Sequence, residues 1–286
     1  MAIVKKYLSE DKTIRLAATV STSLVQASIE HQQVSALSLV LMGRLVTGTA
    51  LMASQLKEQQ KIGVYMRGDG PVGTLFAEAS YEGAVRTYCA NRLAAMDGLN
   101  SVGDGIGTGF LEVVRDLPFQ KEPHRGTVNL KSGEVGEDLA YYLRQSQQIP
   151  AVVALSTTPQ ETGCSSAGGY ILEFMPGFDP KNIDKVEAIQ RQVPALDKLL
   201  EQGARAEDLV ADFLLNIPFE ELEHPHSLRY ECSCSMERME RSLMTIGRSE
   251  IKELIAANEV MEVVCEFCGK KYEINPVGLQ RLLGQM

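Results

Sequence analysis

The pattern of apolar and polar positions divides the chain into three regions. The first, residues 1–178, contains an apolar helical stretch from about Thr22 to Leu56. Short runs rich in β-branched and aromatic residues follow, separated by turn signals such as "DGP". These runs predict strands at 61–68, 72–80, 83–90, 107–117, 125–133, 151–158 and 168–177.

A second helix is predicted between the strands at 125–133 and 151–158. Val135, Leu139 and Leu143 recur at helical spacing, and Ser132 stands where a capping side chain is expected. Acidic residues follow in the early turns, where the helix dipole favours negative charge. Many hairpins with two or more helices predict an α+β fold, in which helices pack on an antiparallel sheet.

The second region, residues 179–231, changes in composition. It holds 12 acidic and 6 basic residues, with apolar residues at helical spacing between prolines. The region therefore predicts a linker of short amphipathic helices whose apolar stripes lie on the first domain. Because each helix makes few contacts, this linker is expected to detach most easily.

The third region, residues 232–286, predicts a small domain rich in cysteine. Helices are expected at 235–247 and 249–258. The segment "MEVVCEFCGKKYEI" (261–274) predicts a hairpin with two cysteines at its turn. No internal repeat is apparent.

Composition and charge narrow the function classes. A chain of 286 residues with 44% apolar residues has room for one large domain and a small one. Its net charge of −9 argues against a nucleic-acid or anionic-membrane partner. The apolar stretch Val34 to Leu56 carries Arg44 at its centre, which costs about 2.5–3.5 kcal/mol on membrane insertion. It is therefore interpreted as a buried core helix.

The opening segment "MAIVKKYLSE" lacks the apolar region of a signal peptide. We therefore expect a cytoplasmic protein. In a reducing compartment, close cysteine pairs indicate metal or redox chemistry more often than a structural disulfide.

Four of the six cysteines form one constellation: Cys232-x-Cys234, thirty intervening residues, then Cys265-x-x-Cys268. Four thiolates suit a tetrahedral ion such as zinc. Gly269 supplies the permissive backbone that such a turn often needs. Three alternatives remain: four unrelated buried cysteines, an iron–sulfur cluster, and a thioredoxin-type site, although no helix start follows the C-x-x-C.

A closed four-sulfur site leaves no position for a catalytic water, so the zinc is expected to be structural or switching. A structural zinc supplies roughly 10–16 kcal/mol of binding free energy in small peptides. A small domain has little other stability, so it should unfold when zinc is lost. Oxidation of the thiolates would have this effect.

These motifs identify a resemblance that covers essentially the whole chain. The sequence resembles the redox-regulated chaperone family of the thirty-three-kilodalton heat-shock protein. The cysteine pairs match the family's C-x-C and C-x-x-C. Other matching segments are "RGDGPVG" (67–73), "GFLEVVRDL" (109–117), "SGEVGEDLAYYLRQSQQIP" (132–150), "AGGYILEFMPG" (167–177) and "CSCSMERMERSLMTIG" (232–247). Pro118 and Gln147 depart from the family's common residues without touching the cysteines.

The resemblance implies a holdase chaperone rather than an enzyme. It implies one zinc ion on Cys232, Cys234, Cys265 and Cys268 in a reduced, inactive state. Oxidative stress would form disulfides Cys232–Cys234 and Cys265–Cys268, release zinc, and unfold the C-terminal domain and linker. The activated chain would form a homodimer, hold unfolding client proteins, and pass them to an ATP-dependent foldase system.

Two other function classes are alternatives to the chaperone. One is an enzyme whose zinc domain is merely structural, but no catalytic constellation is recognisable. The other is a zinc-ribbon adaptor for RNA or ribosomes, which the negative charge disfavours.

Several shorter motifs have simple structural interpretations. "RGD" (67–69) is expected to form a turn, and "GDGIGTG" (103–109) a hairpin turn rather than a phosphate loop. His224 and His226 precede the first cysteine pair and would be alternative ligands, but four thiolates already fill the site. Cys89 and Cys164 stand alone and are expected to be packed thiols.

Overall fold

The computed structural model describes residues 2–118, 120, 122–223 and 226–286. These residues form two compact units, Met1–Glu231 and Cys232–Met286. Each unit is described by itself. The sequence-based division of the first unit at residue 178 stays a prediction.

The first unit is built on one long, mostly antiparallel sheet. Neighbouring strands follow the order β7-β6-β3-β4-β5-β11-β1-β2-β9-β8, and β10 pairs separately with β1. The strands are β1 (Ala2–Ser9), β2 (Ile14–Val20), β3 (Lys61–Gly68), β4 (Thr74–Ser80), β5 (Ala84–Cys89), β6 (Gly109–Asp116), β7 (His124–Asn129), β8 (Ala151–Gln160), β9 (Gly163–Phe174), β10 (Phe219–Glu221) and β11 (His226–Tyr230).

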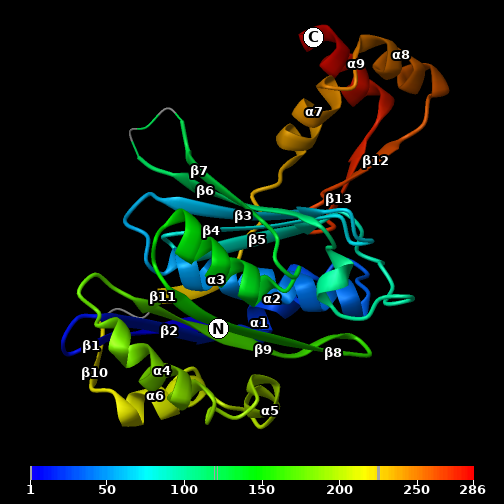
Figure 1. Cartoon of the computed structure of the whole chain (residues 1–286). Helices are drawn as coiled ribbons and strands as arrows, with labels where there is room; N and C mark the ends of the chain where they lie inside the picture. Colours follow the sequence, from blue (N-terminus) through cyan, green and yellow to red (C-terminus); the bar gives the residue numbers. More distant parts are fainter. Residues whose placement is uncertain (1, 119, 121, 224–225) are drawn as a thin grey trace. The chain divides into compact units, whose positions relative to one another are not determined.

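The helices of this unit form two groups. The first group is α1 (Thr22–Ser28), α2 (Ala36–Ala53) and α3 (Val135–Ser146). These helices lie between the two halves of the sheet, so that α2 contacts β4 and β5 on one side and β8 and β9 on the other (Figure 1). The second group covers the outer face of the β1-β2-β9 half and comprises α4 (Ile183–Gln190), α5 (Leu196–Glu201) and α6 (Ala211–Asn216) (Figure 1).

The main core lies around α2, which is apolar on all sides because it is enclosed. This helix is long and apolar enough to cross a membrane, but 89% of its residues are buried inside the unit. The expected core helix is therefore confirmed. The predicted continuous stretch from Thr22 to Leu56 was wrong, since two helices form. Ser35 begins the second by accepting a hydrogen bond from the Ser38 amide at 3.2 Å.

The predicted hairpin strands are confirmed, and β3 occupies the predicted residues 61–68. The cap of α3 differs from the prediction: Glu134, not Ser132, is the residue before the first turn. Gly133 adopts a φ of +74° and turns the chain there, so Ser132 lies one residue too early. The Ser132 hydroxyl instead accepts from the Glu134 amide at 3.3 Å.

The glycine-rich segment 103–109 forms no hairpin turn, contrary to the prediction. It makes a single 3-10 turn at Gly103–Gly105 and then pairs back along the segment that follows β3. The predicted turn at 67–69 was wrong, because Arg67 and Gly68 belong to β3. The turn follows the strand, where the Gly73 amide donates to the Gly70 carbonyl at 3.0 Å. The Asp69 carboxylate accepts a hydrogen bond from the Thr108 amide at 2.7 Å and ties the two segments together.

Residues 179–231 form the predicted short helices and also two strands that the sequence did not indicate. The helices bury Val186, Ile189, Leu200 and Phe213 against strand residues such as Tyr170. The strands β10 and β11 run along β1, and β11 also pairs in parallel with β5. Their sequences, "FEE" and "HSLRY", are short and polar, so only their partners reveal them.

The second unit contains α7 (Met236–Met244), α8 (Arg248–Ala257), the hairpin β12–β13 (Met261–Val264 and Lys271–Ile274) and α9 (Pro276–Gln285). The first two helices and the hairpin were predicted, whereas α9 was not. Its start carries an ordinary cap: the Asn275 side chain accepts from the Gly278 amide at 2.9 Å. The buried core is small, comprising Leu243, Ile251, Ile274, Leu279 and Leu282.

Candidate metal centre

The structure brings four cysteines of the second unit together. The Sγ atoms of Cys232, Cys234, Cys265 and Cys268 all lie within 4.8 Å of one another, and all four are free thiols. The Sγ atoms of Cys232 and Cys265 lie 3.7 Å apart, and those of Cys234 and Cys268 lie 3.5 Å apart. Each of these contacts joins a cysteine of the first pair to one of the second.

The spacing fits a tetrahedral metal ion. Sulfur ligands at about 2.3 Å from a central ion lie roughly 3.8 Å from one another at the corners of a tetrahedron. The two measured separations, 3.5 and 3.7 Å, are close to that edge and far longer than a disulfide bond of about 2.05 Å. The donor set, four sulfurs and no oxygen, favours a soft or borderline ion such as zinc. The four cysteines could therefore hold one metal ion.

The second cysteine pair is placed by the turn of the β12–β13 hairpin. The Cys265 amide donates to the Lys270 carbonyl at 2.9 Å, and the Gly269 amide donates to the Cys265 carbonyl at 2.8 Å. Gly269 adopts a φ of +74°, which confirms the permissive conformation expected at this position. The turn thus directs both sulfurs to one side.

The first pair lies in the extended segment between β11 and α7. Ser235 begins α7 by accepting a hydrogen bond from the Arg238 amide at 3.3 Å. The Arg238 guanidinium donates to the Ser233 carbonyl at 2.9 Å and also to its hydroxyl. The start of α7 therefore fixes the residue between the two cysteines.

Burial opposes the charged form of two of these thiols. It raises the pKa of Cys232, and it raises the pKa of Cys268 to about 11. Burial also acts against the Cys234 thiolate, but hydrogen bonds from Tyr272 and neighbouring thiols outweigh it and lower the pKa of Cys234. Four thiolates this close repel one another, so the fully ionised set needs a cation at its centre.

Tyr272 is a residue of this centre that the sequence analysis missed. Its hydroxyl donates to Cys234 Sγ at 3.1 Å, and its ring lies 5.3 Å from the Lys270 ammonium. Lys271 lies in the same strand but pairs with Glu262 at 3.0 Å. The alternation of the strand was the available signal, because Tyr272 points inward and Lys271 outward.

The other candidate ligands and thiols lie elsewhere. His226 belongs to β11, opposite Val4 of β1, and is not among the clustered residues. His224 lies outside the described residues. Cys89 and Cys164 are buried in the first unit, and burial raises the pKa of each to about 11, which confirms that they are packed thiols.

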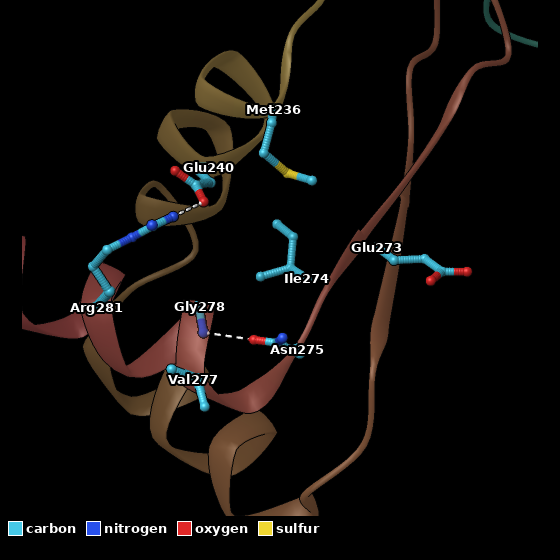
Figure 2. A pocket seen from close by; sticks show the side chains of 8 residues that line it. All are labelled: Met236, Glu240, Glu273, Ile274, Asn275, Val277, Gly278 and Arg281. Carbon is cyan, nitrogen blue, oxygen red and sulfur yellow. Dashed lines mark hydrogen bonds and ion pairs between the residues drawn. The ribbon is translucent and has the colours of Figure 1, made fainter.

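The second unit also contains a hollow of about 380 Å³ between α7, the end of β13 and the start of α9 (Figure 2). Figure 2 shows Arg281 reaching across to Glu240, with which it forms an ion pair, while Glu273 points away. No cysteine lines this hollow. Its ion pair fastens α9 to α7, which supports the domain without forming part of the metal centre.

Three comparisons relate the chain to known proteins. A family model described as "Hsp33 protein" matches residues 3–275. The "33 kDa chaperonin" of Thermoanaerobacter sp. (strain X514) is 34% identical over 288 residues, covering 98% of this chain and 97% of the relative. That of Acetivibrio thermocellus is 36% identical over 281 residues, covering 96% and 94%.

The fold also matches that of a solved structure. The crystal structure of the 33 kDa chaperonin (heat shock protein 33 homolog) from Thermotoga maritima superposes with a TM-score of 0.90 at 26% identity. The match covers 99% of this chain and 98% of that one. The similarity thus extends over both units.

Proposed function

Since the chain belongs to the Hsp33 protein family, we propose that it is a redox-regulated holdase chaperone of the cytoplasm, active in the response to oxidative stress. One observation carries the proposal most directly. Four free thiols meet at metal-binding distance in a unit whose own apolar core cluster has only five buried residues among those described. Such a unit depends on its metal for folding, and its metal depends on reduced sulfur.

In the reduced state, Cys232, Cys234, Cys265 and Cys268 would hold one zinc ion. Zinc bound there would link the start of the domain to the turn of the β12–β13 hairpin and supply roughly 10–16 kcal/mol toward folding. Tyr272 would orient the Cys234 sulfur, and the hairpin turn would orient the second pair.

Oxidation by a peroxide would disassemble this arrangement. A thiolate attacks the peroxide, giving a sulfenic acid and releasing hydroxide or an alcohol. The second thiol then displaces water from the sulfenic acid and completes the disulfide. Each disulfide removes two thiolate ligands, so the zinc ion is released.

We assign the disulfides within each pair, Cys232–Cys234 and Cys265–Cys268. In the folded domain, sulfur contacts of 3.7 and 3.5 Å run between the pairs. However, loop closure favours nearby partners once the domain unfolds, and the cross-pairings would close loops of more than thirty residues. Pairing within each C-x-C and C-x-x-C motif is therefore preferred.

Loss of the domain would release the adjoining helices of residues 179–231. Their buried side chains, including Phe213 and Leu200, cover the apolar outer face of the β1-β2-β9 half-sheet. Separation would expose both surfaces, and exposed apolar patches bind other chains. The activated chain would dimerise, hold unfolding proteins without turnover, and release them to an ATP-dependent foldase system. Nucleic acid and membranes are not expected partners, given the net charge of −9.

The test compares reduced protein with protein treated with peroxide at raised temperature. Light scattering reports aggregation of a thermally unfolded client, and a chromogenic chelator reports released zinc. We expect suppression of aggregation only after oxidation, with about one zinc per chain released, and mass spectrometry should find disulfides within each pair. Equal suppression in both states would remove the redox control, and none in either state would contradict the chaperone assignment.

A further inference from the structure

The strand β11 joins the two halves of the sheet. It pairs antiparallel with β1, through Leu228 opposite Ala2 and His226 opposite Val4. On its other side it pairs in parallel with β5, where the amides of Arg229 and Glu231 donate to Gly83 and Val85 carbonyls at 2.9 Å. Without β11, the facing edges of β1 and β5 would have no strand between them.

The position between these edges is shaped for an extended backbone. Gly83 has a φ of +79°, and a Cβ atom there would stand 1.8 Å from the Ser227 carbonyl oxygen. A side chain at this residue would therefore exclude any strand from the position. Leu228 fills the floor, where it is 2% exposed within the main core cluster. The strand is held by main-chain hydrogen bonds and by Leu228. Tyr230 adds a partly buried contact with the main core, and the Arg229 guanidinium donates to the Glu82 carbonyl at 2.7 Å.

Few side chains of β11 are fully buried. β11 has five residues, of which only Leu228 is fully buried. The preceding strand, β10, lies on the other end of β1, and its three residues are half-buried or exposed. Elements with few buried contacts open most readily.

The chain leads from this strand straight into the metal centre. Glu231, whose amide bonds to β5, directly precedes Cys232. While the cysteine domain is folded, it restrains the end of β11 at that residue. Once the domain unfolds, the strand ends in a free chain of 55 residues and loses that restraint.

We propose that the position held by β11 is a strand-binding site, which an extended segment of an unfolding protein occupies after β11 leaves. The inference rests on the proposed function, and it names where and how a client would bind. The client would add a strand between β1 and β5 by main-chain hydrogen bonds and place one apolar side chain in the Leu228 position. Main-chain recognition with one fully buried side chain demands little of the client's sequence, which suits clients that differ from one another.

A peptide copy of the native segment tests the inference. Fluorescein-labelled peptide with the sequence of residues 219–231 is titrated with the full chain, and anisotropy reports binding. We expect saturable binding to the oxidised, zinc-free chain and none to the reduced, zinc-loaded chain, in which the site is filled. Equal binding to both states would overturn the inference.

Two matched control peptides distinguish strand pairing from nonspecific hydrophobic binding. The Arg229→Pro peptide lacks the amide that donates to Gly83, and the Leu228→Asp peptide brings a carboxylate to an apolar floor. Each should bind at least about tenfold more weakly than the native peptide. Binding of all three with equal affinity would contradict the proposed site.

Competition with a client distinguishes this inference from the proposed function. In the oxidised chain, excess native peptide should restore aggregation of the thermally unfolded client, and the Arg229→Pro peptide should not. If the oxidised chain suppresses aggregation and native peptide leaves this unchanged, the strand site is wrong and the chaperone function stands. If native peptide instead only converts dimers to monomers, the site belongs to a second copy, and the client assignment is wrong. If the oxidised chain binds peptide but protects no client, the chaperone function fails while the strand-binding site stands.

Discussion

At the scale of single residues, the sulfur atoms have two distinct roles. Those of the second unit lie at metal-binding distance and are half-exposed or buried next to one another, whereas Cys89 and Cys164 lie apart in the core of the first unit. Both isolated thiols are enclosed in the core, where burial raises the pKa of each to about 11. Three of the clustered thiols are half-exposed, and a bound cation would stabilise all four as thiolates, the form that reacts with oxidants. Oxidation should therefore select the clustered cysteines.

Replacing one clustered thiol should remove the metal. In Cys268→Ser, a hydroxyl replaces a thiolate ligand, so we expect zinc content to fall from about one per chain to near zero. Cys89→Ala is the matched control, because it removes a buried thiol that contacts no other cysteine in the described chain, and it should keep its zinc. Metal analysis of both purified variants decides the matter, and a fully loaded Cys268→Ser protein would contradict the assignment.

Because of His226, the stability of β11 in the sheet should depend on pH. Burial lowers its pKa below 6.5, and Lys6 adds to this while Glu82 opposes it. A histidine whose pKa is lowered in the folded state stays neutral there. The stabilisation from burying the neutral ring is therefore complete above the unfolded-state pKa of 6.5 and is lost as the pH falls below that value. The strand should therefore open more readily in mild acid.

Hydrogen exchange of the Arg229 and Glu231 amides, corrected for intrinsic rates, measures this opening in the reduced protein. Protection should fall between about pH 7 and pH 5. The His226→Gln variant cannot titrate there and should show a flat profile. A wild-type profile as flat as that of the variant would show that His226 has the same pKa in the closed and open states, and would contradict the expected pH dependence.

At the scale of elements, the hairpin turn that holds the second cysteine pair depends on Gly269. Its φ of +74° is a conformation that costs other residues roughly 1–2 kcal/mol. Gly269→Ala should therefore weaken zinc binding by about tenfold, as measured by competition with a chelator. Gly284→Ala in α9 is the control, because a Cβ there meets nothing within 4 Å, and it should leave the zinc affinity unchanged.

The helices of residues 179–231 offer a second matched pair on α6. Phe213 is fully buried, with its ring 5.7 Å from that of Tyr170, whereas Leu215 of the same helix is 82% exposed. Phe213→Ala should lower the stability of this layer by about 3–5 kcal/mol, while Leu215→Ala should change it by less than about 0.5 kcal/mol.

If release of these helices is what exposes the client surface, Phe213→Ala should hold clients while still reduced and zinc-loaded. Limited proteolysis should then cut the variant within residues 179–231, and light scattering should show suppressed aggregation without added oxidant. A variant that is cut there but remains inactive would separate helix release from client binding.

The elements also show which features a single sequence can reveal. The strand at 61–68 and the C-x-x-C hairpin were predicted because their alternation and turn residues are local signals. β11 was missed because "HSLRY" has little strand character, and its two neighbouring strands, not its own residues, determine its conformation. Tyr272 was missed for a similar reason, since its contact with Cys234 joins residues 38 positions apart.

At the scale of the whole molecule, the two units differ in what stabilises them. The first has a large core around α2 and a second apolar cluster beneath α4–α6. The second has a core of five buried residues and four thiols that converge on one point. Removal of zinc should therefore unfold residues 232–286 and leave the first unit's main core intact.

Zinc removal by chelation in the presence of a reductant tests this separation, because it unfolds the domain without forming disulfides. Hydrogen exchange should show loss of protection in α7–α9 and retained protection in α2. If chelated, reduced protein keeps protection throughout residues 232–286, the metal is not what holds this unit together.

If the proposed function is right, zinc release and client binding are one event, caused by oxidation of Cys232, Cys234, Cys265 and Cys268. A single peroxide titration of the full-length chain at raised temperature tests this, with each sample assayed for released zinc and for suppression of client aggregation. We expect the two curves to coincide and to end at about one zinc per chain, and both to reverse with a reductant and zinc. Suppression that develops without zinc release, or complete release without suppression, would contradict it.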